Sequence, residues 1–540
     1  MLQRTPQKDT YMSKTDTPSS GLAKSAATVS IAVMCSRLLG LVREQVFAGL
    51  FGAGYAYDSF VVAFRIPNLL RDLFGEGALS AAFVAVFSDY DANRSKEDTW
   101  LLASNVLCFF IVAISIITLL GMLFADQIVG LLAPDFSTIS GKAELTATMT
   151  VIMMPFLLFI SLAAVVMGIL NTKKRFFIPS LASSFFNLGS IIGGTALAFL
   201  LPRYGYPAII GMAFGTLIGG FLQLAVQLPV LKKVRFRFTP RLNLSDPGLI
   251  RVLKLMIPAT IGLSATQINI FINTNFASSC AEGSVSWLNY AFRLVQLPIG
   301  LFGVAISIAA LPVLARQAST KNFTEMRETF VSSLTMVFCL TIPATAGLIV
   351  LADPIIRVIF EHGAFTAADT QATAVALSLY GIGLFAYSAN KVIVPVYYAI
   401  NAARYPVIAS FLAIGFNVLI IINTIDYFQH RAIALSTSAV MIINFLFLMV
   451  VLYRKINGFS LATLLTGMLK ILFAAALMTI VLIFLHDQFH QQFNRSILSQ
   501  CMYLLILISL SASLYIGALH VLGLQELKEI TAKLKTRFAR

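Results

Sequence analysis

The sequence predicts an all-α polytopic membrane protein with 14 transmembrane helices. Hydrophobic residues make up 58% of the 540 residues and charged residues only 12%, against roughly 45–50% and about 25% in soluble proteins. Apolar residues recur in long stretches between residues 25 and 523, and a helix needs about 20 of them to cross a bilayer. Because no alternating barrel pattern occurs, each stretch is expected to be a helix.

These stretches define the expected helices and their order. Their ranges are 25–50, 57–90, 101–125, 146–170, 178–200, 207–231, 249–279, 284–315, 327–351, 369–399, 405–425, 432–453, 461–485 and 498–523. The polar residues 1–24 have no apolar segment and no cleavage site of a signal peptide, so they are expected to form a cytoplasmic tail.

The distribution of basic residues supports this count and orients the chain. The sequence has 39 Lys and Arg against 24 Asp and Glu, a formal net charge of +15. With 14 spans, 25 basic residues fall in the tails and connections of one side, and five in the connections of the other. Basic residues accumulate on the cytoplasmic side, so both termini are expected in the cytoplasm. The charge thus reflects topology and predicts no nucleic-acid partner.

An internal repeat relates the two halves of the chain. A shift of 228 residues places 62–87 on the block that begins at Tyr290, with Ala-Phe-Arg at 63–65 on 291–293 and Leu-Phe-Gly at 73–75 on 301–303. Helix 2 therefore corresponds to helix 8, and each half has six helices in the same orientation. Such parallel repeats pack as two lobes around a central cavity and can rock between two states.

The repeat predicts the organisation of the whole chain. The expected regions are an N-terminal tail (1–24), an N-lobe of helices 1–6 (25–231), a C-lobe of a cytoplasmic linker and helices 7–12 (232–453), helices 13 and 14 (454–523) and a basic cytoplasmic tail (524–540).

Five arginines inside the expected spans are candidate functional residues: Arg37, Arg43, Arg65, Arg71 and Arg293. A guanidinium that faces lipid costs about 2.5–3.5 kcal/mol, so four of them in helices 1 and 2 would cost about 10 kcal/mol or more. They are expected to face an aqueous cavity or polar partners. A bend at Gly40 and another at Pro67 would let each pair of arginines point inward, which is a hypothesis.

Two interpretations of these arginines remain open. They can pair with Glu44, Asp58, Asp72 and Glu76 and only hold helices together, or they can form an anion site, since guanidinium groups bind phosphate through paired hydrogen bonds. Arg293 has no acidic residue within four positions, which favours the second interpretation. Lys391 is a weaker candidate that can equally reach the membrane surface.

Several function classes lack their motifs. The five cysteines have no metal-binding spacing, and neither HExxH nor a phosphate-binding loop occurs, so no metal, cofactor or catalytic residue is expected. A membrane glycosyltransferase or phosphotransferase is an alternative, but it would need a catalytic domain or an acidic metal-binding loop. The longest connections have only about 15–20 residues, so the chain is expected to be a transporter and not an enzyme.

The sequence resembles the MurJ/MviN family, the lipid II flippases of the multidrug/oligosaccharidyl-lipid/polysaccharide exporter superfamily. The resemblance covers nearly the whole chain and rests on SRLLGLVRE (36–44), FGAGYAYDSFVVAFRIPNLLRDLFGEGALSAAFV (51–84), NTKKRFFIPS (171–180), GSVSWLNYAFRL (283–294), FEHGAFTAADT (360–370) and NKVIVPVYYA (390–399). It implies a fourteen-helix fold and a role in peptidoglycan synthesis and cell shape at the bacterial inner membrane.

The resemblance also implies a substrate and a site. Family members move undecaprenyl-pyrophosphate-linked disaccharide-pentapeptide, lipid II, from the inner to the outer leaflet by alternating access. The family's cavity residues match Arg37, Arg43, Arg71 and Arg293, with polar partners at Asp58, Asn68 and Glu76; Arg65 and Lys391 are further candidates. Phe292 and Asp72 depart from the family pattern, which often has an acidic and a basic residue there.

Other expectations follow from the same resemblance. The lipid tail is expected to stay in the membrane lipid or to lie along helices 13 and 14, and the peptidoglycan-synthesis machinery is a candidate partner. A related exporter of another polyprenyl-linked oligosaccharide is the alternative transport function. The sodium site of some family members has no recognisable motif in this sequence.

Overall fold

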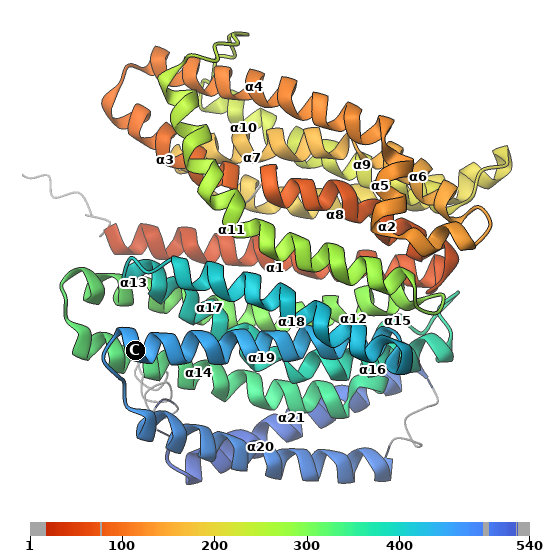
Figure 1. Ribbon diagram of the computed structural model, residues 1–540, viewed down its shortest axis with the longest axis vertical. Helices are drawn as coiled ribbons and strands as arrows, with labels where there is room; N and C mark the ends of the chain where they lie inside the picture. The colour runs from red at the N-terminus through yellow and green to blue at the C-terminus, as the bar shows by residue number, and fades with distance from the viewer. Residues whose placement is uncertain (1–17, 76–77, 490–495, 525, 527–540) are drawn as a thin grey trace, which may run out of the picture.

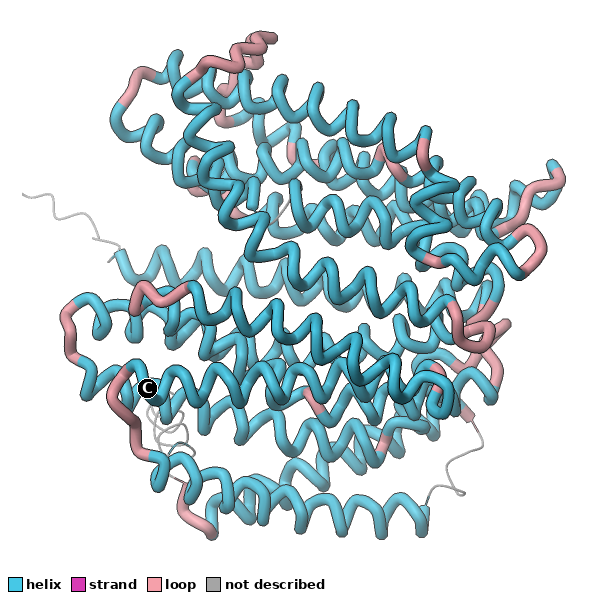
Figure 2. The backbone as a smooth tube through the Cα atoms, in the orientation of Figure 1, coloured by secondary structure: helices cyan, strands magenta, loops and turns pink. Residues whose placement is uncertain are grey.

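The computed structural model describes residues 18–75, 78–489, 496–524 and 526, and in this part of the chain all regular elements are helices (Figure 2). The elements before the central linker are α1 (Pro18–Phe51), α2 (Tyr55–Leu70), η1 (Arg71–Gly75), α3 (Ala78–Asn93), α4 (Lys96–Leu123), α5 (Ala125–Leu132), η2 (Pro134–Thr138), α6 (Lys142–Met153), α7 (Phe156–Thr172), α8 (Phe177–Leu200), η3 (Leu201–Tyr204), α9 (Ile209–Ala225) and α10 (Leu228–Lys233).

The elements after the linker complete the chain. They are α11 (Pro247–Ser278), α12 (Ser284–Pro298), η4 (Ile299–Val304), α13 (Ala305–Ser319), α14 (Phe323–Val350), α15 (Ala352–Phe360), α16 (Ala367–Ile382), α17 (Leu384–Ala399), α18 (Arg404–Phe428), α19 (His430–Lys455), α20 (Leu461–Phe489) and α21 (Ile497–Val521).

Eleven helices of the described residues are long and apolar enough to cross a membrane, and a twelfth span results if the bent pair α16–α17 counts as one. These correspond to 12 of the 14 expected spans. The other two expected spans, 25–50 and 57–90, are occupied by α1 and by α2, η1 and α3. They carry four of the arginines discussed above, and α1 begins seven residues earlier than expected.

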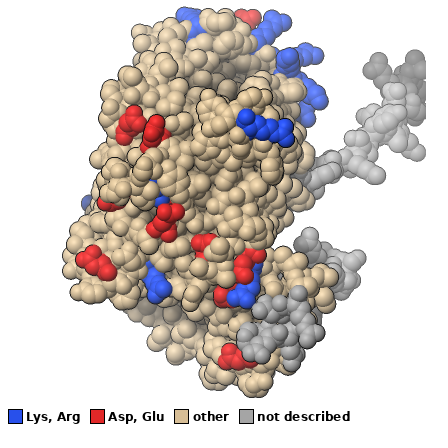
Figure 3. Space-filling view, turned by 90° about the vertical axis from the view of Figure 1, so that its right-hand side faces the viewer, with Lys and Arg blue, Asp and Glu red and all other residues tan. Residues whose placement is uncertain are grey.

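The helices form two groups with α1 and α11 between them (Figure 1). One group contains α2–α10 and the other contains α12–α21, with α20 and α21 at the far edge of the molecule. The helix α1 packs against α8, and α11 packs against α3 in the first group and α18 in the second. Seen from the right-hand side of Figure 1, the surface is largely uncharged, with Lys and Arg gathered along the upper edge (Figure 3).

Polar residues at the chain's helix starts define where several helices begin. Asp246 accepts hydrogen bonds from the backbone N–H groups of Gly248 and Leu249 at the start of α11. Thr366 and Asp369 cap α16 reciprocally, and Ser95 caps α4. Such caps satisfy N–H groups that have no partner within the helix, which also fixes the direction in which each helix leaves its loop.

Two π-helical segments interrupt the helices that carry candidate residues. The segment η1 follows α2 and begins at Arg71, and η4 follows α12 and begins at Ile299. These starts are 228 residues apart, which is the shift of the sequence repeat. By contrast, the helical assignment of α1 runs unbroken through Gly40. The change in helix geometry in the second span thus falls four residues after Pro67, at Arg71.

The two groups are joined at one end by a shared core. A single cluster of buried apolar residues includes side chains of α1, α2, α6, α9, α12 and α16, whereas separate clusters fill each group elsewhere. At this joint the Ala364 N–H donates to the Gly49 carbonyl at 2.9 Å. Gly363 has φ +62°, and a Cβ there would lie 2.1 Å from the Gly49 oxygen, so the close approach requires glycine.

Candidate functional site

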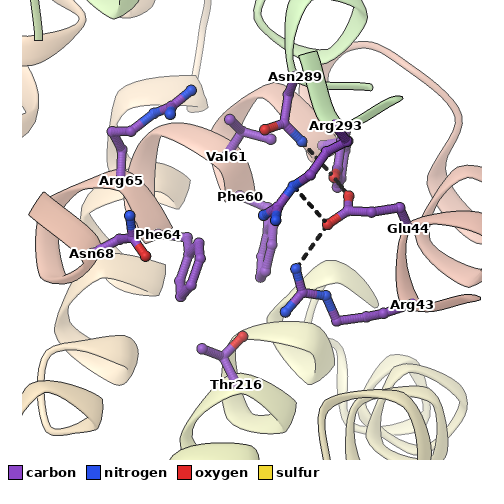
Figure 4. Close-up of a pocket in the computed structure, with 11 residues that line it drawn as sticks. Arg43, Glu44, Phe60, Val61, Phe64, Arg65, Asn68, Thr216, Asn289 and Arg293 are labelled. Atoms are coloured by element: carbon purple, nitrogen blue, oxygen red, sulfur yellow. Dashed lines mark hydrogen bonds and ion pairs between the residues drawn. The ribbon is translucent and has the colours of Figure 1, made fainter. Parts of the chain in front are cut away.

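A small cavity lies between the two groups of helices and is lined by three of the five candidate arginines. Its lining residues are Arg43, Glu44, Tyr57, Phe60, Val61, Phe64, Arg65, Asn68, Thr216, Asn289 and Arg293. They come from α1, α2 and α9 of the first half and from α12 of the second (Figure 4). The cavity volume is about 40 Å³, enough for roughly three water molecules.

The carboxylate of Glu44 is the centre of this site. Its Oε1 atom is 2.8 Å from Nη2 of Arg43 and 3.5 Å from Nε of Arg293, which comes from the other half (Figure 4). Glu44 and Arg43 are buried, whereas the Arg293 side chain is 38% exposed. Two guanidinium groups thus share one carboxylate, which leaves a net positive charge and spare N–H donors beside the cavity.

Two neutral side chains complete the network around Glu44. The hydroxyl of Tyr57 donates to Oε2 of Glu44 at 2.5 Å, and the Asn289 amide donates to the Tyr57 hydroxyl at 3.1 Å. The Tyr57 ring stacks on Tyr290 with centroids 4.7 Å apart. Since Tyr57 belongs to α2 and Asn289 to α12, this network connects the two halves a second time.

Arg65 lines the same cavity without a partner for its charge. Its Nε atom is buried, and within the described part of the chain its guanidinium has no hydrogen-bond or ion-pair partner. Asn68 follows at the next helical turn and also lines the cavity. A buried N–H without a partner is costly unless a ligand or water satisfies it, and the charge of Arg65 adds to the positive character of the site.

Arg71 and Arg37 lie outside the cavity. Arg71 forms an ion pair with Asp72, at 2.8 Å, and Asp72 also accepts a hydrogen bond from Gln267 of α11 at 3.3 Å. Asp72, which departs from the family pattern, therefore offsets part of the charge of Arg71. Arg37 is exposed, and its guanidinium lies against Gly300 of the second half.

Asp58, which was expected near the substrate, is not among the residues that line the cavity. Asp58 is 1% exposed. Its Oδ2 atom accepts hydrogen bonds from Nζ of Lys142 at 3.0 Å and from the backbone N–H of Gly283 at 2.9 Å. The N–H and hydroxyl of Ser286 donate to its other oxygen at 2.9 and 2.6 Å. Four donors thus occupy its acceptor positions, and Asp58 joins the two halves in this structure.

The remaining sequence candidates are placed elsewhere. Lys391 is exposed on α17 and is not among the residues that line the cavity. Glu76 lies outside the described residues. Phe292, the other departure from the family pattern, packs edge-on against Tyr380 at 5.3 Å and takes no part in the charge network. The described residues contain no group of three or more His, Cys, Asp or Glu that could hold a metal ion.

Sequence reasoning missed three parts of this site: the central position of Glu44, and the contributions of Tyr57 and Asn289. Glu44 was recognised only as a candidate partner of an arginine. A usable signal exists for Asn289, which precedes Arg293 by one helical turn and so shares its face. No local pattern indicates that Tyr57 meets Glu44, because that contact depends on how α1 packs against α2.

The fold and the cavity define a multi-span membrane transporter with a basic interior site. Within that class, the chain belongs to the lipid II flippase MurJ family, whose sequence profile matches residues 47–504. It is a multi-pass inner-membrane protein.

Similar proteins agree with this assignment. A chain of Buchnera aphidicola subsp. Schizaphis graminum named "probable lipid II flippase MurJ" is 35% identical over 505 residues, 93% of this chain and 97% of the relative. The lipid II flippase MurJ of Burkholderia cenocepacia is 34% identical over 443 residues, 80% of this chain and 84% of the relative.

Solved structures show the same fold. A structure described as lipid II flippase MurJ in an inward closed conformation matches with a TM-score of 0.75 and 31% identity, over 91% of this chain and 97% of the other. An inward-facing multidrug resistance transporter of the MATE family matches with a TM-score of 0.67 at 15% identity, over 80% and 98%, and shares the fold alone.

Proposed function

We propose that this protein is a lipid II flippase, which moves the undecaprenyl-pyrophosphate-linked peptidoglycan precursor from the inner to the outer leaflet by alternating access. The observation that carries the proposal is the charge balance of the cavity. Among the described residues, Arg43, Arg65 and Arg293 line it together with one carboxylate, Glu44. A site with excess guanidinium groups suits a pyrophosphate, which offers several charged acceptor oxygens to paired N–H donors.

The proposed transport architecture has 14 spans, arranged as a six-helix N-lobe (25–231), a six-helix C-lobe with its linker (232–453) and two added helices (454–523), between cytoplasmic tails 1–24 and 524–540. The equivalent π-helical segments η1 and η4 support the parallel repeat, because the structure repeats an unusual helix geometry at the sequence shift of 228. The count of basic residues supports cytoplasmic termini.

The proposed substrate site has two levels. Arg43, Arg65, Asn68 and Arg293 surround the cavity. Arg37 lies beyond it on α1, and Arg71 lies beyond it at the start of η1, which follows α2. A volume of about 40 Å³ is far too small for the sugar-peptide headgroup, so the lobes have to separate before it binds. Separation at the Glu44 network exposes the arginines, and the phosphates then replace the carboxylate as their partner.

The proposed path of the lipid tail follows α20 and α21. Large apolar side chains of α20, among them Leu465, Phe473 and Ile480, are more than half exposed. A polyprenyl chain can stay in contact with this surface while the headgroup crosses within the lobes. The membrane potential, negative inside, favours the return of the empty, positively charged cavity to the cytoplasmic side. Moving one charge across the membrane changes the free energy by about 2.3 kcal/mol per 100 mV. The peptidoglycan-synthesis machinery remains a proposed partner.

The proposal is tested by replacing the arginines of the cavity one at a time. In a bacterial strain depleted of its own flippase, Arg43→Ala and Arg293→Ala are expected to abolish growth support and to leave lipid II in the inner leaflet, at normal protein levels in the membrane. Arg357→Ala is the matched control, because Arg357 forms ion pairs within α15 and at its end, away from the cavity. Full growth with both cavity variants would contradict the anion site.

A further inference from the structure

The guanidinium of Arg37 occupies the place of a missing side chain in the other half of the molecule. Arg37 belongs to α1, and Gly300 belongs to the π-helical segment η4 that follows α12. A Cβ atom at Gly300 would lie 1.6 Å from Nη1 of Arg37, 2.4 Å from Cζ and 2.5 Å from Nη2. Arg37 can therefore adopt this position only because residue 300 is glycine.

The charge of Arg37 is uncompensated in this position. Within the described part of the chain, its guanidinium has no hydrogen-bond or ion-pair partner, and the residue is exposed. Arg43 and Arg71, in contrast, each hold a carboxylate at 2.8 Å. Arg37 thus lies at the boundary between the halves with N–H donors that a ligand can take without breaking an existing ion pair.

The internal repeat shows what the protein has at the equivalent place in the first half. The residue 228 positions before Gly300 is Asp72, in the other π-helical segment. Asp72 accepts a hydrogen bond from Gln267, which lies on α11, the counterpart of α1. A side chain of each half thus contacts the π-helical segment of the other half. The contacted residue is a carboxylate in one case, Asp72, and a glycine without a side chain in the other, Gly300. A carboxylate at residue 300 would neutralise Arg37.

We propose that Gly300 is a positioning residue for substrate binding, which seats the guanidinium of Arg37 at the boundary between the halves and leaves its donors available to a pyrophosphate. The inference rests on the proposed function and extends it to a residue that carries no charge. Gly300 acts only through Arg37: it supplies space and keeps acidic groups away. The chemical class recognised is a polyprenyl diphosphate headgroup.

The substitution Gly300→Ala isolates this role. The three atoms closest to the added methyl group all belong to the mobile end of Arg37, which can swing away at little cost. Gly303→Ala would not be a usable variant, because its Cβ would lie 2.9 Å from the Cα of Ser388. Alanine also suits a helical backbone better than glycine does. Gly300→Ala is therefore expected to fold and to displace only Arg37.

The experiment is a double-mutant cycle on the purified full-length chain, titrated with farnesyl pyrophosphate, a soluble short polyprenyl diphosphate. Arg37→Ala is expected to weaken binding about tenfold, the scale of one charge-assisted hydrogen bond. In the protein that keeps Arg37, Gly300→Ala is expected to weaken binding by a similar factor. In the Arg37→Ala variant, the additional change Gly300→Ala is expected to weaken binding no further. Gly347→Ala is the control, since no atom lies within 4 Å of its added Cβ.

Three outcomes would overturn the positioning role. Unchanged binding by Gly300→Ala would show that the space at residue 300 is not needed for binding. Additional weakening by Gly300→Ala in the Arg37→Ala variant would show that Gly300 acts otherwise than through Arg37. If Arg37→Ala and Arg293→Ala both bind as the unmodified protein does, the arginine site itself fails and the role of Gly300 with it. Weakening by those two variants together with normal binding by Gly300→Ala contradicts the positioning role alone.

Discussion

Asp58 and Ser286 meet across the boundary between the two halves of the molecule. One oxygen of the Asp58 carboxylate accepts both the backbone N–H of Ser286 at 2.9 Å and its hydroxyl at 2.6 Å. Ser286 lies in the first turn of α12, where N–H groups have no partner within the helix. A carboxylate of one half therefore caps a helix of the other, and the same helix carries Arg293 about two turns further on.

Asp58→Ala is expected to destabilise this joint strongly. The substitution leaves the ammonium of Lys142, which is 1% exposed, without its partner. Removing one member of a buried ion pair costs about 3–5 kcal/mol, because the remaining charge is neither solvated nor paired. Thermal unfolding of the detergent-solubilised protein measures this loss. The double variant Asp58→Ala, Lys142→Met is expected to unfold at a higher temperature than the single variant, and a lower temperature would contradict the ion-pair explanation.

Tyr57→Phe is expected to weaken the network at Glu44. The variant removes the hydroxyl that donates to the buried carboxylate and that accepts from Asn289, while the ring keeps its stacking on Tyr290. A hydrogen bond to a charged group contributes about 1.5–3 kcal/mol to stability. Denaturant unfolding should show a loss of this size, and Tyr398→Phe, at an exposed tyrosine of α17, should show none. Equal stability of the two variants would contradict the prediction.

Gly363→Ala is expected to open the joint at the shared core. Residue 363 has φ +62°, which costs a non-glycine residue about 1–3 kcal/mol, and the new Cβ would meet the Gly49 oxygen at 2.1 Å. The hydrogen bond from Ala364 to Gly49 is then lost as well. Thermal unfolding is the measurement, with Gly347→Ala as the helical control. Unfolding of Gly363→Ala at the control temperature would show that the close approach is dispensable.

Asp72→Asn is expected to strengthen anion binding. The amide keeps an oxygen for the hydrogen bond from Gln267 but no longer offsets the charge of Arg71. Because this ion pair is about a quarter exposed, its removal should raise the affinity for farnesyl pyrophosphate only about two- to fivefold and should steepen the dependence on salt. Asp353→Asn, which changes an ion pair of α15, is the control. Weaker binding by Asp72→Asn would contradict the assignment of Arg71 to the site.

The sequence predicts the helical fold because membrane crossing imposes a simple rule. A span needs about 20 apolar residues and has to satisfy its own backbone, so length and composition locate 12 of the 14 expected spans among the described residues. The two expected spans that are not among these 12, 25–50 and 57–90, carry four of the five candidate arginines, Arg37, Arg43, Arg65 and Arg71. Arginines inside expected spans indicate a polar interior, because a guanidinium that faces lipid is costly.

The arginines were predictable as a group, but their individual partners were not. Burial cost alone shows that Arg43, Arg65 and Arg293 need a polar surrounding, and they do line one cavity. The pairing of Asp58 with Lys142 links residues 84 positions apart, and that of Glu44 with Arg293 links α1 with α12. Such contacts depend on the packing of helices that are remote in sequence, and the periodicity of one helix contains no information about them.

The sequence by itself determined that this protein is a helical membrane transporter with a repeated half and with more interior arginines than interior acids can balance. Only the tertiary structure decided which arginines are compensated. Glu44 serves two of them from opposite halves, Asp72 offsets Arg71, and Arg37 lies against the bare backbone of Gly300. The physical reason is that a charge depends on what lies within a few ångströms of it, and those neighbours come from packing across the boundary between the halves.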